Sequence, residues 1–315
     1  MKQFIAFIVA ALLACSAAQA EKEPCASAGD DNPYLGTQTI RLWPGDAPEA
    51  KGNACEDIPT LTVFESSGGG SGKGSTVIIM PSGGYNQLTG KAGREAANWF
   101  TARGFRAFIL SYRLSPNGYL MPVPLLDARR AIQLVRARAL EFQIDPHRIV
   151  VAGFSAGGHL AALASTSFVP GKPDAEDPIQ RVSSRPDYLV LGYAWVGAFD
   201  SNTGYCERYK TLDGCAALRA KFAPDLLVSK DTPPTFLYHT FNDESVPVEQ
   251  ALRFYQALVK AGVPSEMHIF PNGSHGSGLG KGDPSLDQWP NLLENWLRAQ
   301  GLLTPAKLAE APKTK

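Results

Sequence analysis

The sequence has no excess of charge of either sign, and it contains no basic run. Its 315 residues include 30 Lys and Arg and 30 Asp and Glu, so the formal net charge is +0. Nucleic acids and acidic membrane surfaces attract proteins that concentrate positive charge. The balance therefore argues against both kinds of partner. Hydrophobic residues make up 44% of the chain and charged residues 19%, a composition that supports a sizeable core.

Patterns typical of metal sites are also missing. The five cysteines include no Cys-x-x-Cys pair, and the five histidines are not clustered along the chain. Zinc sites in proteins are built from three or four such ligands. We therefore expect no metal ion.

A long apolar run occurs once, at residues 4–14. Lys2 precedes it, and Ala18-Gln19-Ala20 follows as a small-x-small cleavage pattern. The run is too short to span a bilayer comfortably. We therefore expect residues 1–20 to be a signal peptide, the protein to be secreted or periplasmic, and no stable insertion in a membrane. The second-ranked interpretation is a lipoprotein signal. Leu12-Leu13-Ala14-Cys15 approximates a lipoprotein box, and a lipid on Cys15 would anchor the protein to the outer membrane.

Four cysteines remain after cleavage at Ala20, and an even number in an exported chain suggests disulfides. Proximity in the sequence favours the pairs Cys25–Cys55 and Cys206–Cys215. The alternative is four free thiols.

Strand and helix patterns alternate along most of the chain, which predicts an α/β fold: a mostly parallel sheet with helices on both faces. We expect a lead-in at residues 21–37, a single domain at 38–303, a tail at 304–315 and a surface loop at 66–74. Strands are predicted at 40–43, 61–64, 76–80, 105–111, 148–152, 188–193, 235–240 and 266–270, and helices at 95–103, 127–142, 158–164, 248–261 and 289–300.

The most informative motif is Gly153-Phe154-Ser155-Ala156-Gly157, which lies between a predicted strand and a predicted helix. Gly-x-Ser-x-Gly at such a turn is typical of the nucleophile elbow of α/β-hydrolases. A Cβ at either flanking glycine would clash where strand and helix crowd together. The bend forces the serine into a strained backbone conformation, and the helix N-terminus favours negative charge beside it. Ser155 is therefore the predicted nucleophile.

A serine nucleophile needs a base, and the base needs an orienting acid. In this fold they follow in the order Ser, Asp or Glu, His. His275 lies in a glycine-rich loop just past the last predicted strand, at the sheet edge where open α/β sheets place their sites. Asp243 and Glu244 both follow the strand at 235–240, and we prefer Asp243 because its shorter side chain suits a fixed bond to the imidazole. The other histidines are expected in or beside strands and helices: His147, His159, His239 and His268.

Backbone N–H groups are expected to form an oxyanion hole. One is the amide of Ala156, directly after the serine. The others are expected in the loop Met80-Pro81-Ser82-Gly83-Gly84-Tyr85, where glycines let the backbone approach a carbonyl. The alternative is an ordinary glycine turn.

Several motifs together resemble the bacterial acetylxylan-esterase-like branch of the α/β-hydrolases, which is related to the hormone-sensitive-lipase type and to feruloyl esterases of gut bacteria. The resemblance covers roughly residues 38–302. The segments that carry it are Ile40–Gly45, Pro81–Tyr85, Gly153–Gly158, Asp231–Thr235, Asp243-x-x-Val246-Pro247 and Gly273–Gly276.

This resemblance implies a triad and an oxyanion hole. The implied triad is Ser155, Asp243 and His275, and the implied hole consists of the amides of Gly83, Gly84 and Ala156. The chain departs from the family at Ser82, where a third glycine is usual, and at residues 194–222. We expect the latter segment to form part of the acyl or alcohol pocket.

The expected activity is hydrolysis of acetyl or other short-chain esters, on hemicellulose-type carbohydrates, without a cofactor. Tyr85 and Trp195 are candidate substrate-contacting residues, since an aromatic face at the triad edge stacks on a sugar ring. The alternative is that such aromatics belong to the core, as we expect of Tyr193. A feruloyl or general carboxylesterase is the runner-up. Three other classes rank lower. A prolyl-oligopeptidase-type peptidase would normally carry a large propeller domain, and a lipase would show an apolar lid, neither of which this sequence offers. A non-catalytic binding protein would have lost a triad member, and none is lost here.

Overall fold

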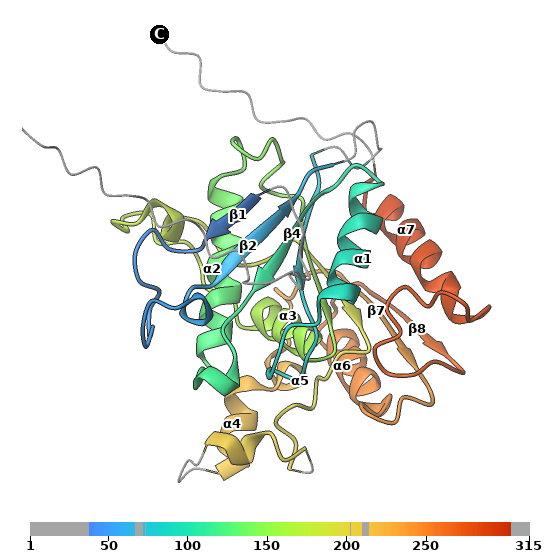
Figure 1. The fold of residues 1–315 in the computed structure, drawn as a ribbon. Helices are drawn as coiled ribbons and strands as arrows, with labels where there is room; N and C mark the ends of the chain where they lie inside the picture. Colours follow the sequence, from blue (N-terminus) through green and yellow to red (C-terminus); the bar gives the residue numbers. More distant parts are fainter. Residues whose placement is uncertain (1–37, 67–71, 73, 202, 210–213, 304–315) are drawn as a thin grey trace, which may run out of the picture.

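A computed structural model of the protein describes residues 38–66, 72, 74–201, 203–209 and 214–303 (Figure 1). The predicted signal peptide, lead-in and tail, and most of the predicted loop at 66–74, lie outside these residues. The described chain forms an eight-stranded sheet in the order β1-β2-β4-β3-β5-β6-β7-β8. The strands are β1 (Gln38–Arg41), β2 (Thr60–Phe64), β3 (Thr76–Met80), β4 (Arg106–Ser111), β5 (Ile149–Phe154), β6 (Tyr188–Gly192), β7 (Thr235–Thr240) and β8 (Ser265–Phe270).

The last six strands of this order are parallel, while β2 pairs antiparallel with both β1 and β4. The predicted α/β fold is therefore confirmed. The helices are α1 (Gly90–Thr101), α2 (Val123–Ala137), α3 (Ala156–Thr166), α4 (Gly214–Phe222), α5 (Pro224–Leu227), α6 (Glu249–Lys260) and α7 (Trp289–Ala299).

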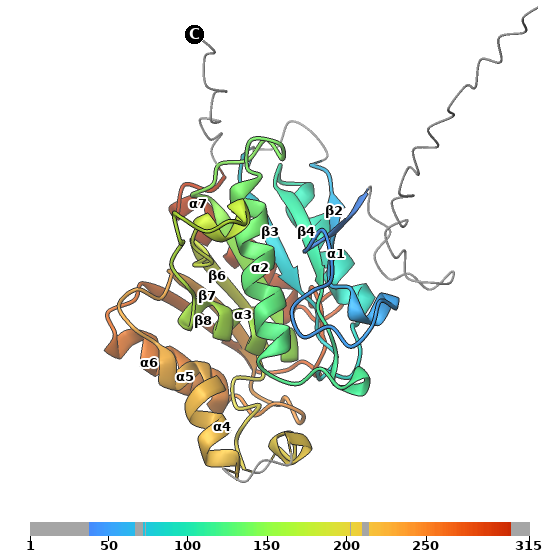
Figure 2. The same cartoon turned by 90° about the vertical axis from the view of Figure 1, so that its left-hand side faces the viewer.

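Alternate residues of the central strands enter two separate cores. Ile78 and Val151 belong to the core under α2, α3 and α6, whereas Val77 and Val150 belong to the core under α1 and α7. Successive side chains of a strand point to opposite faces, so a run of apolar residues supplies both cores. Figure 2 shows α2 and α3 in front of the strands and α7 behind them.

Two helices differ from their predicted bounds. The helix predicted from Glu95 begins at Gly90: glycine lowers helix propensity, but packing against the sheet overrides it. The helix predicted over residues 127–142 instead covers Val123–Ala137, because Pro124 fits a first turn and the last residues form turns. Leu140, which lies in these turns and not in the helix, is 53% exposed.

The helices α4 and α5 were not predicted. The helix α4 forms the end of the segment at 194–222 and α5 follows it, and α4 lies at the bottom of both views (Figures 1 and 2). Among all described helices, none combines the length and the apolar character needed to cross a membrane.

Candidate active site

Ser155 lies at the sharp turn between β5 and α3, with φ +53° and ψ −121°. This backbone region is strained for a residue with a side chain. The flanking glycines are required by close approach: a Cβ on Gly153 would lie 2.3 Å from the carbonyl oxygen of Gly157, and a Cβ on Gly157 would lie 2.1 Å from that of Met80. The strand–turn–helix arrangement expected from the motif is present.

A hydrogen-bonded relay starts at this serine. Ser155 Oγ lies 2.8 Å from Nε2 of His275, and Nδ1 of His275 lies 2.8 Å from Oδ2 of Asp243. The loops after β7 and β8 deliver these two side chains to the end of β5. The structure therefore brings together the three residues that the sequence selected, although 120 residues separate the serine from the histidine.

Asp243 is buried and its carboxylate is well supplied with donors. The N–H groups of Ser245 and Val246 donate to Oδ1 at 2.9 and 2.8 Å. Burial alone would raise the pKa of Asp243, but hydrogen bonds from His239, His275 and the Val246 N–H hold it below its usual value. The carboxylate therefore stays ionised at neutral pH. Glu244, the alternative acid, is exposed.

The interpretation of His239 as an ordinary packed strand residue missed a contact. Its fully buried ring places Nε2 2.8 Å from the carbonyl oxygen of Val246 and 3.5 Å from Oδ2 of Asp243. Since both neighbours are acceptors, Nε2 carries the proton. His239 thus directs a second ring N–H at Oδ2 of Asp243, the oxygen that His275 also contacts. The sequence did contain a signal for this contact: His239 lies four residues before Asp243, near the end of the strand that Asp243 follows.

The loop after β3 approaches the start of α3. A Cβ on Gly157 would also lie 2.4 Å from the carbonyl oxygen of Pro81, so the turn after Ser155 packs on this loop. Gly83 and Gly84 have φ +128° and +63°. Among the described residues, no hydrogen bond uses the N–H of Gly83, Gly84 or Ala156, so these donors are free for a ligand oxygen.

Ser82, which replaces the usual third glycine, ties the loop to the start of α1. Its hydroxyl forms a hydrogen bond with that of Thr89, and its carbonyl oxygen accepts from the Thr89 N–H at 3.0 Å. The departure from the family motif therefore adds an anchor to the loop.

The two candidate substrate-contacting aromatics differ. Tyr85 is fully buried, and its hydroxyl lies 2.7 Å from Nδ1 of His159. The prediction of a side-chain contact with substrate is therefore corrected: burial gives Tyr85 a supporting position. Trp195 is partly exposed, and its backbone N–H donates to the carbonyl oxygen of Ser155 at 2.9 Å. Tyr193 is a core residue, 2% exposed, with its ring 5.1 Å from that of His275.

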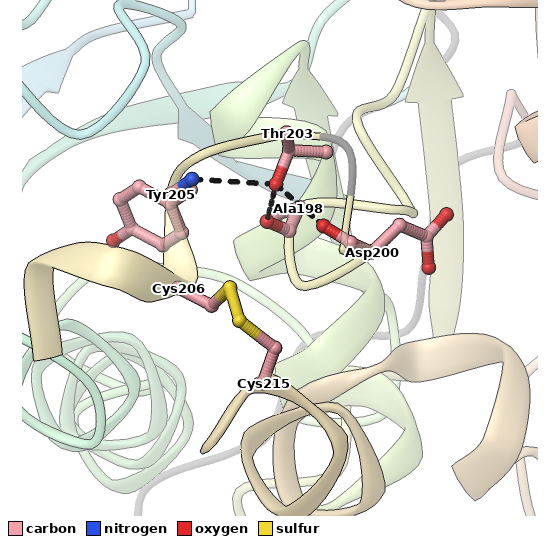
Figure 3. Close-up of a disulfide and its surroundings, with 6 residues drawn as sticks. All are labelled: Ala198, Asp200, Thr203, Tyr205, Cys206 and Cys215. Carbon is pink, nitrogen blue, oxygen red and sulfur yellow. Dashed lines mark hydrogen bonds between the residues drawn. A yellow bond between two sulfur atoms is a disulfide. The ribbon is translucent and has the colours of Figure 1, made fainter. Parts of the chain in front are cut away.

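Cys206 and Cys215 form a disulfide (Figure 3). Cys25 lies outside the described residues, so its pairing with Cys55 stays a prediction. Within the described ranges, no group of three or more His, Cys, Asp or Glu side chains is arranged to hold a metal ion.

Two family models match the chain in succession. BD-FAE matches residues 67–184, and the prolyl oligopeptidase family matches residues 188–300. Among solved structures, the acetyl ester-xyloside bifunctional hydrolase from Caldicellulosiruptor lactoaceticus is 37% identical with a TM-score of 0.76. The similarity covers 85% of this chain and 97% of that one.

Curated relatives are longer than this chain. Endo-1,4-beta-xylanase B of Butyrivibrio fibrisolvens is 31% identical over 69% of this chain. Acetylxylan esterase of Xylanibacter ruminicola is 29% identical over 72% of it. The chain spans only 36% and 46% of these two relatives.

Proposed function

Since this chain belongs to the acetylxylan-esterase-like branch of the α/β-hydrolases, we propose that it is a serine esterase that hydrolyses short acyl esters. The observation that carries the proposal is the relay Ser155–His275–Asp243, with 2.8 Å at both hydrogen bonds. It supplies a nucleophile, a base and an orienting acid in contact with one another.

In the proposed reaction, Ser155 Oγ attacks the ester carbonyl carbon while Nε2 of His275 takes the hydroxyl proton. Asp243 holds the Nδ1–H and stabilises the imidazolium. The N–H groups of Gly83, Gly84 and Ala156 receive the oxyanion of the tetrahedral intermediate. Its collapse expels the alcohol, which takes the proton from His275, and leaves an acyl-enzyme. Water then hydrolyses the acyl-enzyme by the same route, without a cofactor.

The proposed substrates are acetyl esters of hemicellulose-type carbohydrates. Two observations support this class. The relatives include an acetylxylan esterase, a xylanase and an acetyl ester-xyloside hydrolase, and the partly exposed Trp195 is anchored to the backbone of Ser155. We further propose that the protein is secreted or periplasmic, which the Cys206–Cys215 disulfide supports.

A direct test compares the protein with its Ser155→Ala variant on p-nitrophenyl acetate and on acetylated xylo-oligosaccharides. Turnover of both should fall by about 10⁴-fold or more, with the circular dichroism spectrum unchanged. A fluorophosphonate should label Ser155 alone. A loss of only a few-fold in the folded variant would remove Ser155 from the proposed mechanism.

The match to the prolyl oligopeptidase family makes a peptidase the second candidate. A proline-containing peptide p-nitroanilide distinguishes the two functions, because its scissile bond is an amide. Hydrolysis of this amide at a rate comparable to that of p-nitrophenyl acetate would favour the peptidase.

A further inference from the structure

Tyr85 ends the loop that carries Gly83 and Gly84, and it too has a positive φ, +62°. A tyrosine adopts this region only where its surroundings hold it there. The ring is fully buried, and the Tyr85 carbonyl oxygen accepts from the N–H of Ser115 at 2.9 Å. The conformation of the loop therefore depends on what surrounds this side chain.

His159 holds the hydroxyl of Tyr85. The Nε2 atom of His159 lies 2.8 Å from the carbonyl oxygen of Phe222, which only accepts, so Nε2 carries the proton and Nδ1 is the acceptor for Tyr85. Burial raises the pKa of Tyr85 well above its usual value, so the hydroxyl keeps its proton and donates it.

His159 belongs to the same helix turn as the nucleophile. It lies on α3, and its backbone N–H donates to the carbonyl oxygen of Ser155 at 3.0 Å. The Tyr85–His159 hydrogen bond therefore connects the glycine loop to the helix that begins at the nucleophile.

Tyr205 holds the ring of Tyr85. The two rings are stacked, with centroids 5.3 Å apart and planes 23° from parallel. Tyr205 directly precedes the disulfide cysteine Cys206, and Figure 3 shows its N–H turned toward the hydroxyl of Thr203, at 3.4 Å. Arg208, on the same segment, donates to Oδ1 of Asn86 at 2.5 Å.

We propose that His159 and Tyr205 are positioning residues for the oxyanion hole, and that they act through Tyr85 on the N–H groups of Gly83 and Gly84. This inference rests on the proposed esterase function and adds residues that do not touch the substrate. It also gives the disulfide-bearing segment a role, since that segment presents Tyr205 to the loop.

Loss of such a positioning contact should lower kcat more than it changes KM. Oxyanion donors bind the charge that develops in the transition state, and removing one of them costs about 10²–10³ in kcat. Displacing the loop should cost less than removing a donor, and we expect roughly a tenfold loss of kcat. A trifluoromethyl ketone with a short acyl group forms a tetrahedral oxyanion on serine, so its affinity should fall by the same factor.

The test uses Tyr85→Phe, which removes one hydroxyl and keeps the ring stack. We expect kcat on p-nitrophenyl acetate and the ketone affinity to fall together, with KM within about twofold. The matched control is Tyr119→Phe, which removes another buried hydroxyl, bonded to Asp57, and should leave both values unchanged. Equal losses in the two variants would assign the effect to general stability and overturn the inference.

Two further comparisons separate the contacts. His159→Leu should lower kcat at least as much as Tyr85→Phe does, since it also removes the bond to the Phe222 carbonyl oxygen. The double variant should lose no more than the worse single one, because both changes remove the Tyr85–His159 hydrogen bond. If the fold-loss of kcat in the double variant equals the product of the two single losses, His159 does not act through Tyr85 and the inference is contradicted. Tyr205→Leu removes the stacked ring and should lower kcat and the ketone affinity together, with KM within about twofold.

The outcomes also separate this inference from the proposed function. A folded wild-type protein without activity on any ester contradicts the proposed function. An active wild type whose Tyr85→Phe variant keeps its kcat and ketone affinity contradicts the positioning roles alone. Where His159→Leu fails to fold, Tyr85→Phe carries the test.

Discussion

Nδ1 of His275 lies 2.8 Å from Oδ2 of Asp243, while the adjacent carboxylate of Glu244 is exposed to solvent. This relationship predicts very different costs for two neutralising substitutions. Asp243→Asn should lower kcat by about 10⁴-fold, because an amide can hold the imidazole in the wrong tautomer. Glu244→Gln should change kcat by less than about threefold, as its exposed charge is screened by solvent. Steady-state kinetics on p-nitrophenyl acetate measures both, and the reverse order of damage would transfer the role of the acid to Glu244.

The residues around Ser155 could be predicted from the sequence because their constraints are local. Gly153 and Gly157 are imposed by contacts within the turn itself and with the neighbouring loop. His275 and Asp243 could be selected because each follows a strand, and parallel strands bring their carboxyl ends to one edge.

Other features of the site depend on contacts between distant segments. Tyr85 stacks on Tyr205 and is bonded to His159. A local pattern does not reveal which of two aromatics in separate loops, Tyr85 or Trp195, will be covered. The helix α4 begins just before Cys215, in a stretch with weak periodicity. Its place is set by the disulfide and by ion pairs of Arg219 with Asp200 and Asp225, both at 2.8 Å.

The disulfide Cys206–Cys215 should resist alkylation in protein recovered from an oxidising compartment. Denatured mature protein should show no free thiol, and peptide mapping should find Cys206 joined to Cys215 and Cys25 joined to Cys55. The reduced protein, alkylated in the same way, is the control for complete labelling. Four alkylated cysteines without reduction would contradict both pairs and weaken the proposal of export.

The buried His159 should make stability fall in mild acid. Burial lowers the pKa of His159 from 6.5 to about 4, so between these values the unfolded chain binds a proton that the folded protein does not. The contribution of the neutral imidazole to the free energy of unfolding is fully present above about pH 6.5 and is lost as the pH falls toward 4. The loss amounts to about 3 kcal/mol.

The measurement compares urea unfolding of the wild type and His159→Leu at pH 7 and pH 4. The difference in free energy of unfolding between the two proteins should shrink by about 3 kcal/mol at the lower pH. Taking the difference between the two proteins cancels the contributions of other titrating groups. Asp127 is one of them: burial raises its pKa to about 6 despite its hydrogen bonds from Arg113, so its effect on stability has the opposite pH dependence. A difference that is independent of pH would show that His159 titrates alike in both states.

The proposed acyl specificity predicts a steep dependence on chain length. Acetyl esters should be cleaved faster than butyryl or longer ones, because a pocket that rejects a methylene costs roughly 1–3 kcal/mol for each one. Values of kcat/KM for p-nitrophenyl esters from acetate to octanoate measure this, and a parallel assay follows acetate release from acetylated xylo-oligosaccharides. Equal rates along the series, with no acetate released from the sugar, would make the protein a general carboxylesterase.

Trp195 should matter for sugar esters and little for small aryl esters. Its backbone N–H donates to the carbonyl oxygen of Ser155, and its ring packs at 5.4 Å on Tyr205. The residue stays partly exposed, so its ring can stack on a sugar ring. Trp195→Ala should raise KM for acetylated xylo-oligosaccharides by about tenfold, equivalent to about 1.4 kcal/mol of lost binding, and change kcat/KM for p-nitrophenyl acetate by less than about threefold. The aryl ester serves as the internal control, because it shares the acyl group and lacks the sugar. An equal loss on both substrates would show that the Trp195 ring supports the site through its packing on Tyr205, and would move the sugar contact elsewhere.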